Sequence, residues 1–487
     1  MASFYLFVTK EEHGGKTTAL LSQYSKPPYW GKESIYFVLE NREESLKKAL
    51  ERNGNNKNTR FPYKVINNSL DIYKLSNRIL HEGNNFYSPK SVFIDDIHLL
   101  DPLILLVVFN LLRRGINVYA SANLFIDENN KYPYPFIHSL LSYADVIDYN
   151  TTLNIVNKEE ENKGRLIVYT GPMGSGKTFN LIRTIKLINS KNNGNNIIVK
   201  HSFDVERTRD YFIRTQSRMT AESFKVESKP AKDVKDLERI INDSGEREKL
   251  KNISIDEMNF FGWNSKDKGD KNFKFLMEKV DDEKIIKVLS ELYNYYSEFF
   301  KDLRGKLNNI FSDKFINNFE EEINLLKHYF LLYKRGSDNI SRGDKQNKQD
   351  SEIFYIKTSP TTRFILNLLN KGVNVYVSGL ELAFNGIPFP PTSLLLPFAD
   401  EIKKYKAVCY HCNKEEATMT VRFSKMNKID KESNILLPAD GKEKIIKVGS
   451  VGDQYSSSCK GDYPIESFIL FNLIQAMEFL VNQSNHN

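Results

Sequence analysis

The sequence predicts an α/β fold, in which a parallel β-sheet is flanked by helices, and it predicts this fold twice. A short apolar strand at 165–170 runs into the glycine-rich string GPMGSGKT at 171–178, which opens an amphipathic helix. A second apolar strand, at 253–257, ends in an acidic pair. Weaker versions of both features recur within the first 150 residues. We therefore expect two parallel sheets of the P-loop NTPase type.

Length and composition are those of a globular chain with more than one domain. The 487 residues are 40% hydrophobic and 27% charged, which excludes a peptide and global disorder. The net charge of +7 favours anionic ligands only weakly. No apolar run approaches the roughly 20 residues of a membrane helix, and the N-terminus lacks the pattern of a secretory signal. We expect a cytoplasmic chain with no membrane association.

The two halves share landmarks in one order, which predicts a tandem duplication rather than two unrelated P-loop-like strings. The interval from Lys16 to Asp95 equals that from Lys177 to Asp256. The paired landmarks are G-K-T at 15–17 and 176–178, acidic pairs at 95–96 and 256–257, similar strand phrases at 113–126 and 370–383, and A-D phrases at 142–149 and 397–405.

The landmarks and composition divide the chain into six parts. The predicted parts are a degenerate P-loop domain at 1–156, a linker at 157–164, an active P-loop core at 165–263 and 359–405, a charged, largely helical insertion at 264–358, a knuckle and β-arm at 406–463, and a C-terminal helix or tail at 464–487.

The string at 171–178 has the residues that a nucleoside triphosphate site needs. Its glycines let backbone N–H groups converge on phosphate oxygens, Lys177 neutralises the β and γ phosphates, and Thr178 is a magnesium ligand. Asp256 would hold the magnesium from the second strand. Glu257 would activate water in an ATPase, or take the proton of an acceptor hydroxyl in a kinase. These residues alone leave both reactions open.

The three cysteines predict a metal site. Cys409 and Cys412 have the spacing of a thiolate knuckle, and Cys459 and Asp462 repeat that offset further on. Three thiolates with the Asp462 carboxylate would hold a structural Zn²⁺, and packed thiols without metal are the alternative. The segment 436–459 between them predicts a β-hairpin arm, which suits a lid.

Taken together, these motifs resemble the zinc-containing, type II thymidine kinases. The matching strings are GPMGSGKT, IDEMNFFGW, VSGLELAFNGIPFP, AVCYHC with EEATMTVR, and KVGSVGDQYSSSC. The resemblance implies transfer of the ATP γ-phosphoryl group to the 5′-hydroxyl of thymidine, with deoxyuridine as another acceptor, and a knuckle-and-arm lasso over the substrate. It also implies a homo-oligomer, here a dimer of tandem chains.

The resemblance assigns roles residue by residue, with Glu257 as the catalytic base. ATP and magnesium would be bound by Gly171, Pro172, Met173, Gly174, Ser175, Gly176, Lys177, Thr178, Asp256 and Asn259. Thymidine would be bound by Phe260, Phe384, Phe389, Thr420, Ile446, Lys447, Val448, Gly449, Ser450 and Tyr455. The zinc ligands would be Cys409, Cys412, Cys459 and Asp462, although the family pattern has cysteine or histidine at the last position.

The first copy departs from the pattern. Its loop begins Lys10-Glu11-Glu12, and these glutamates would repel phosphate. Asp96 stands where the second copy has the glutamate, and no arm precedes Asn150. We expect catalysis by the second copy alone. The competing predictions are a P-loop ATPase acting on nucleic acid, which the absence of a basic stripe with aromatics disfavours, and a nucleotide-binding regulatory pseudoenzyme. Direct nucleic-acid binding is not expected.

Overall fold

A computed structural model gives the fold, and its described residues belong to one compact unit, 1–263 with 353–472. Described are 2–149, 163–261, 360–424 and 453–460, except 11–14, 26–33, 53–62, 68, 79–88, 101–103, 127–132, 135–136, 192–194, 209–210, 215–224, 244–249, 385, 387 and 415. The predicted insertion at 264–358 and C-terminal segment at 464–487 lie outside these residues.

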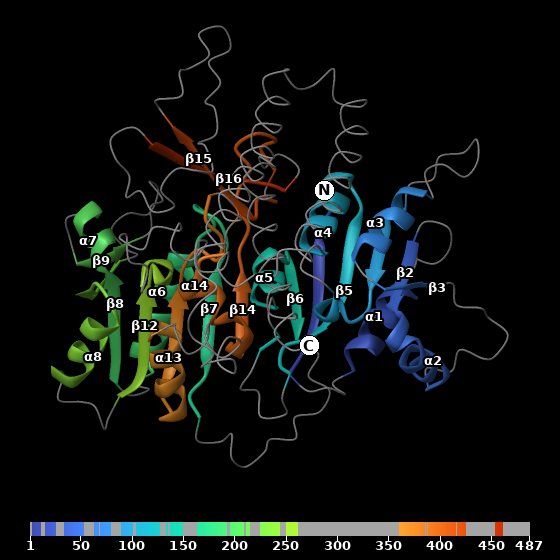
Figure 1. Cartoon of the computed structure of the whole chain (residues 1–487). Coiled ribbons are helices and arrows are strands. Elements are labelled where there is room, and N and C mark those ends of the chain that lie inside the picture. Colours follow the sequence, from blue (N-terminus) through green and yellow to red (C-terminus); the bar gives the residue numbers. More distant parts are fainter. Residues whose placement is uncertain are drawn as a thin grey trace, which may run out of the picture. The chain divides into compact units, whose positions relative to one another are not determined.

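The first of the two predicted copies, called the first copy below, contains a six-stranded sheet whose strand pairs are all parallel (Figure 1). The strand order is β3 (Tyr63–Ile66), β2 (Ser34–Leu39), β4 (Ser91–Ile94), β5 (Asn117–Asn123), β1 (Phe4–Thr9) and β6 (Val146–Tyr149). Every residue of β2 and β4 is buried, as expected of strands covered on both faces.

The second copy contains a six-stranded parallel sheet with the equivalent order. Its strands are β11 (Lys229–Ala231), β8 (Asn195–His201), β12 (Leu250–Asp256), β13 (Asn374–Ser378), β7 (Leu166–Thr170) and β14 (Glu401–Lys404). β7 therefore has the place that β1 has in the first sheet. The predicted α/β class and parallel sheets are confirmed.

Helices flank both sheets (Figure 1). In the first copy they are α1 (Lys16–Tyr24), α2 (Glu43–Arg52), α3 (Ser69–Arg78), α4 (Ile104–Arg113) and α5 (Ile137–Tyr143). In the second they are α6 (Lys177–Ser190), α7 (Ser202–Thr208), α8 (Val234–Asp243), α13 (Pro360–Asn370) and α14 (Pro390–Ser393). Within the described part of the chain, no helix is long and apolar enough to cross a membrane.

Aromatic side chains fill the core between α1 and the first sheet. The Phe93 ring stacks on Tyr119 with centroids 4.8 Å apart and meets Tyr24 edge-on at 5.0 Å. Tyr36 stacks on the same phenylalanine at 6.3 Å. Each such burial stabilises the fold by roughly 1.5–3 kcal/mol, so the first copy keeps a well-packed core.

The two copies also share special backbone positions. Asp96 and Glu257 both follow the third strand in the order of their sheet, β4 and β12, with φ of 53° and 56°. Asp145 Oδ2 accepts from Phe4 N at 2.8 Å, and Asp400 Oδ2 accepts from Leu166 N at 2.8 Å. Each aspartate thus fixes the start of the fifth strand in the order of its own sheet, β1 or β7.

Two short antiparallel pairs complete the described strands: β9 (Phe212–Arg214) with β10 (Lys225–Glu227), and β15 (Met419–Ser424) with β16 (Asp453–Ser458). The second pair bears on the predicted arm. β16 lies at the end of the segment expected to form a hairpin, and its partner is β15, which precedes that segment. Residues 425–452, which hold the bend of the predicted hairpin, lie outside the described part.

Candidate active site

The glycine-rich string forms a loop between β7 and α6. Gly176 precedes the helix with φ of 86°, and Gly171 has φ of 136°. A Cβ at Gly171 would lie 2.2 Å from the carbonyl oxygen of Tyr405, so a side chain there would clash with backbone. Glycine alone takes these conformations without strain. The loop therefore leads directly into a helix N-terminus, where backbone N–H groups can bind a phosphate.

Lys177, the first residue of α6, folds back over the loop. Its Nζ donates to the carbonyl oxygen of Pro172 at 2.7 Å. Desolvation lowers the pKa of Lys177, and the nearby carboxylates of Glu381, Glu257 and Asp256 act in the opposite direction. A phosphate oxygen is a stronger acceptor for this ammonium than a carbonyl, so a nucleotide can replace the contact with Pro172.

Asp256 ends β12 beside the loop, where Thr178 Oγ1 donates to Asp256 Oδ1 at 3.3 Å. Burial raises the pKa of Asp256 to about 6, and Asp204 adds to the rise, while the Ser378 hydroxyl and Lys177 lower it. Carboxylate and hydroxyl oxygens side by side are ligands that Mg²⁺ prefers. The residues present therefore fit a magnesium ion next to the phosphate loop.

Glu257 follows directly, in the left-handed backbone region. Its φ of 56° precedes the short 3₁₀ helix η4 (Met258–Phe260), and its carbonyl oxygen accepts from Phe260 N at 3.1 Å. A non-glycine residue in this region is uncommon and costs about 1 kcal/mol or more. This backbone conformation places the half-buried Glu257 at the carboxyl edge of the sheet, where ligands bind in open α/β folds.

Glu381 is a site residue that the motif analysis does not identify. Its side chain is buried, and its Oε2 accepts from Gly171 N at 2.8 Å and from the hydroxyl of Thr170. One carboxylate thus anchors both residues at the entrance to the loop. It lies there because it follows β13, the strand that pairs with β7, and parallel neighbours end at the same edge.

The β15–β16 pair meets the loop on another side. Thr420 Oγ1 accepts from Met173 N at 3.2 Å, which brings a predicted substrate residue onto a predicted ATP residue. Arg422 is fully buried, and its guanidinium carbon lies 5.1 Å from the Phe384 ring centre and 6.0 Å from that of Tyr455. The guanidinium holds two predicted substrate aromatics by cation–π attraction, a role the sequence analysis missed.

The remaining predicted residues divide into three groups. Phe389 is buried, and its N donates to the Glu381 carbonyl oxygen at 2.9 Å, whereas Phe260 is half-buried with its ring centre 5.6 Å from that of His201. Asn259 is buried and accepts from Leu380 N at 3.0 Å, a contact that ties η4 to the segment after β13. Outside the described residues lie Ile446, Lys447, Val448, Gly449, Ser450 and Asp462.

The three cysteines converge. The sulfur atoms of Cys409, Cys412 and Cys459 all lie within 4.8 Å of one another, and those of Cys412 and Cys459 are 3.9 Å apart. Two thiolates bound tetrahedrally to one zinc at about 2.3 Å have sulfurs about 3.8 Å apart. The donor set therefore fits Zn²⁺.

In the equivalent region of the first copy, the described side chains pair with one another. Lys16 Nζ lies 3.0 Å from Asp96 Oδ1, and Arg42 Nε lies 3.5 Å from Asp96 Oδ2. Thr17 Oγ1 donates to Asp95 at 3.1 Å. Burial raises the pKa of Asp95 to about 6, and the neighbouring Asp96 adds to the rise. The lysine equivalent to Lys177 is thus engaged by a carboxylate.

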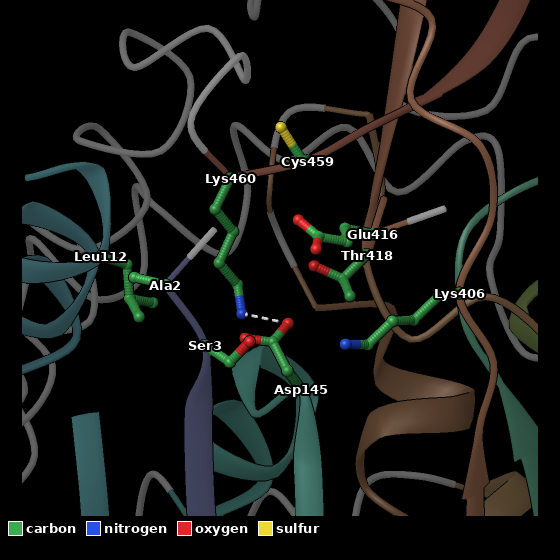
Figure 2. A pocket seen from close by; sticks show the side chains of 9 residues that line it. All are labelled: Ala2, Ser3, Leu112, Asp145, Lys406, Glu416, Thr418, Cys459 and Lys460. Atoms are coloured by element: carbon green, nitrogen blue, oxygen red, sulfur yellow. Dashed lines mark ion pairs between the residues drawn. The ribbon is translucent and has the colours of Figure 1, made fainter. Parts of the chain in front are cut away.

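A small pocket has no residue of the phosphate loop in its lining (Figure 2). It is lined by Asp145 from the first copy and by Lys406, Glu416, Thr418 and Lys460, among others, from the second. Figure 2 shows the Lys460 ammonium pointing at the Asp145 carboxylate, and the two atoms are 2.6 Å apart. The pocket is therefore spanned by an ion pair between the copies.

The second sheet with its loop, Lys177 and the Asp256 carboxylate defines a P-loop nucleotide-binding protein. The profile of the thymidine kinase family matches residues 164–305 and 352–463, more than half of the chain. The chain belongs to the thymidine kinase family.

Curated relatives agree with this family. A thymidine kinase of Pseudothermotoga lettingae is 37% identical over 86 residues, 18% of this chain and 43% of that protein. One of Ureaplasma parvum is 31% identical over 121 residues, 24% of this chain and 49% of the relative. A thymidine kinase of Bacteroides fragilis is 47% identical over 45 residues, which are 9% of this chain and 23% of that protein. The chain thus spans less than half the length of each of these relatives.

Proposed function

We propose that the second copy transfers the γ-phosphoryl group of ATP to the 5′-hydroxyl of thymidine. The observation that carries this proposal is the hydrogen bond from Met173 in the phosphate loop to Thr420 on β15. It joins the nucleotide site to a strand pair that holds Phe384 and Tyr455 through Arg422. The acceptor would thus lie close to the phosphate that it receives.

The roles follow from position and charge. Glu257 takes the 5′-hydroxyl proton while the hydroxyl oxygen bonds to the γ-phosphorus and the bond to the ADP oxygen breaks. Lys177 neutralises charge on the β and γ phosphates. Thr178 and Asp256 would hold Mg²⁺, which supplies further charge neutralisation when bound.

Thymine recognition would rest on aromatic contacts. Phe260 and Phe384 flank the base, Met173, Phe389 and Thr420 line its pocket, and Tyr455 packs over the nucleoside. Main-chain groups of 446–450 read the base edge. Deoxyuridine, which differs from thymidine only by the missing 5-methyl group, is included as an alternative acceptor.

The wider organisation is part of the same proposal. Equal strand order and equivalent Asp145 and Asp400 contacts support a tandem duplication with a degenerate first copy. The three converging sulfurs support a structural zinc. Family membership supports a cytoplasmic enzyme, and we propose a homodimer of tandem chains.

One assay tests the function against its competitors. ATP consumption is measured with thymidine, with deoxyuridine, with single-stranded DNA and with no acceptor, using Lys177→Ala as the inactive control. We expect consumption only with the nucleosides, matched by nucleoside monophosphate formed. Consumption that depends on DNA would favour the nucleic-acid ATPase, and ATP binding without any turnover would favour the pseudoenzyme.

A further inference from the structure

The C-terminal end of α5 in the first copy is bound by two lysines of the second copy. The last carbonyl groups of a helix have no intrahelical partner and carry the negative end of its dipole. Here four consecutive carbonyl oxygens, those of residues 141–144, accept from lysine ammoniums. Lys404 Nζ donates to three of these oxygens, and Lys460 Nζ donates to the Tyr143 oxygen at 2.7 Å.

Lys404 makes three of the four contacts with these carbonyl oxygens. Its Nζ lies 3.0 Å from the Leu141 oxygen and 2.6 Å from those of Ser142 and Ala144. Three acceptors match the three N–H groups of an ammonium. The side chain is 9% exposed, and desolvation lowers the pKa of Lys404, while Glu381 and Asp145 oppose the change.

The same ammonium reaches the phosphate loop through one carboxylate. Lys404 Nζ lies 3.5 Å from Glu381 Oε1, and the other oxygen of Glu381 accepts from Gly171 N at 2.8 Å and from the Thr170 hydroxyl. Both side chains are buried, so solvent screens their attraction only weakly. An unbroken polar chain thus connects the end of α5 to the first residue of the loop.

We infer that the first copy positions the phosphate loop of the second: the α5 carbonyls orient Lys404, Lys404 orients Glu381, and Glu381 holds Gly171. Lys404 is then a positioning residue for nucleotide binding, since it touches no reacting atom. The inference rests on the proposed function, because it takes the loop to be an ATP site. It gives the first copy a role of its own, because α5 supports the phosphate loop of the second copy through Lys404.

The test uses the full chain and follows ATP and thymidine separately. Lys404→Met keeps an unbranched side chain that is one atom shorter and removes the charge. We expect the KM and Kd for Mg·ATP to rise about tenfold, equivalent to about 1.4 kcal/mol, because the buried ion pair with Glu381 is lost. The KM for thymidine should stay unchanged. Lys404→Arg, which keeps charge and donors, should lie closer to the wild type.

Lys403→Met is the matched control. Lys403 is the neighbouring residue on β14, and its side chain is 37% exposed beside Glu401. It should leave both KM values unchanged. Glu381→Gln should raise the KM for ATP as Lys404→Met does, and the double variant should match the stronger single variant, because both changes interrupt one chain of contacts.

The outcomes separate the inference from the function. Wild-type thymidine phosphorylation with an unchanged ATP KM in Lys404→Met, or additive effects in the double variant, overturns the inference alone. A wild-type chain that binds no ATP overturns the proposed function as well. If Lys404→Met does not fold, Glu381→Gln decides, because it leaves the lysine–carbonyl contacts in place; an unchanged ATP affinity there overturns the inference.

Discussion

Asp96 and Glu257 stand at equivalent strand ends in the same left-handed backbone conformation, with φ of 53° and 56°. The side chains differ by one methylene, and that of Asp96 is paired with Lys16 at 3.0 Å. Because the backbone conformation is shared and the side-chain chemistry differs, we expect different roles for the two proposed copies. The following predictions test that division.

The first prediction concerns the proposed base. Glu257→Gln should lower kcat for thymidine by about 10²- to 10⁴-fold, the usual contribution of a positioned base. The KM for ATP should change little, because the phosphate loop and Lys177 remain. Steady-state kinetics with varied ATP and thymidine measure both. Turnover near the wild-type value would remove Glu257 from the mechanism.

The second prediction concerns the first copy. Lys16→Ala with Asp96→Ala should leave thymidine phosphorylation nearly unchanged, since no described contact joins this pair to the phosphate loop. Asp96→Ala alone should lower the free energy of unfolding by about 3–5 kcal/mol, because it leaves the Lys16 ammonium buried without its carboxylate. The free energy of unfolding should fall less in the double variant than in Asp96→Ala.

Urea unfolding and kinetics on the same samples check this second prediction. Lys47→Ala, which removes an exposed ammonium from α2, is the control for nonspecific effects. A double variant that stays folded but loses most of its activity would show that the first copy takes part in nucleotide chemistry.

Local patterns predicted the loop and the strands because their signals are local. A strand, glycines and Lys177 in succession specify a phosphate loop wherever they occur. Glu381 and Lys404 could not be found in this way, because their partners lie far along the chain: Gly171 for Glu381 and Ser142 for Lys404. Nothing in the string VSGLELA at 377–383 shows whether Glu381 is buried and hydrogen-bonded or exposed at the surface.

The predicted arm shows a similar limit. A bend rich in glycine predicts a hairpin, but pairing partners depend on tertiary contacts. β16 pairs with β15, in the register Arg422 opposite Tyr455. That register sets the buried guanidinium against an aromatic that the family resemblance assigns to the substrate. Arg422 itself could not be predicted, because a buried arginine cannot be distinguished from a surface one by sequence alone.

The third prediction concerns metal. Purified chain should contain about one zinc, and Cys412→Ser should lose most of it, because its sulfur lies 3.9 Å from that of Cys459. The free energy of unfolding should fall in the same variant, since bound metal stabilises the folded state. Elemental analysis and thermal melts with and without a chelator measure the two effects. A zinc-free wild type with full activity would contradict a structural zinc site.

The last prediction concerns pH and follows from Asp256. Burial raises the pKa of Asp256 from 3.8 to about 6, so between these values the folded chain binds more protons than the unfolded one. The favourable contribution of Asp256 to the free energy of unfolding is therefore present at low pH and is lost as the pH rises from about 4 to about 6.

Asp256→Asn removes that ionisation, so it should stabilise the nucleotide-free chain near pH 7 by about 1–3 kcal/mol and flatten part of the pH dependence. It should also abolish the stabilisation that Mg·ATP gives the wild type. Burial also raises the pKa of Asp95, so Asp95 contributes the same pH dependence to the free energy of unfolding in the wild type and in Asp256→Asn. Urea titrations at pH 4.5 and 7, with and without Mg·ATP, compare the two chains. If the substitution destabilises the nucleotide-free chain at pH 7, the Asp256 carboxylate is not the unfavourably buried charge that its surroundings imply.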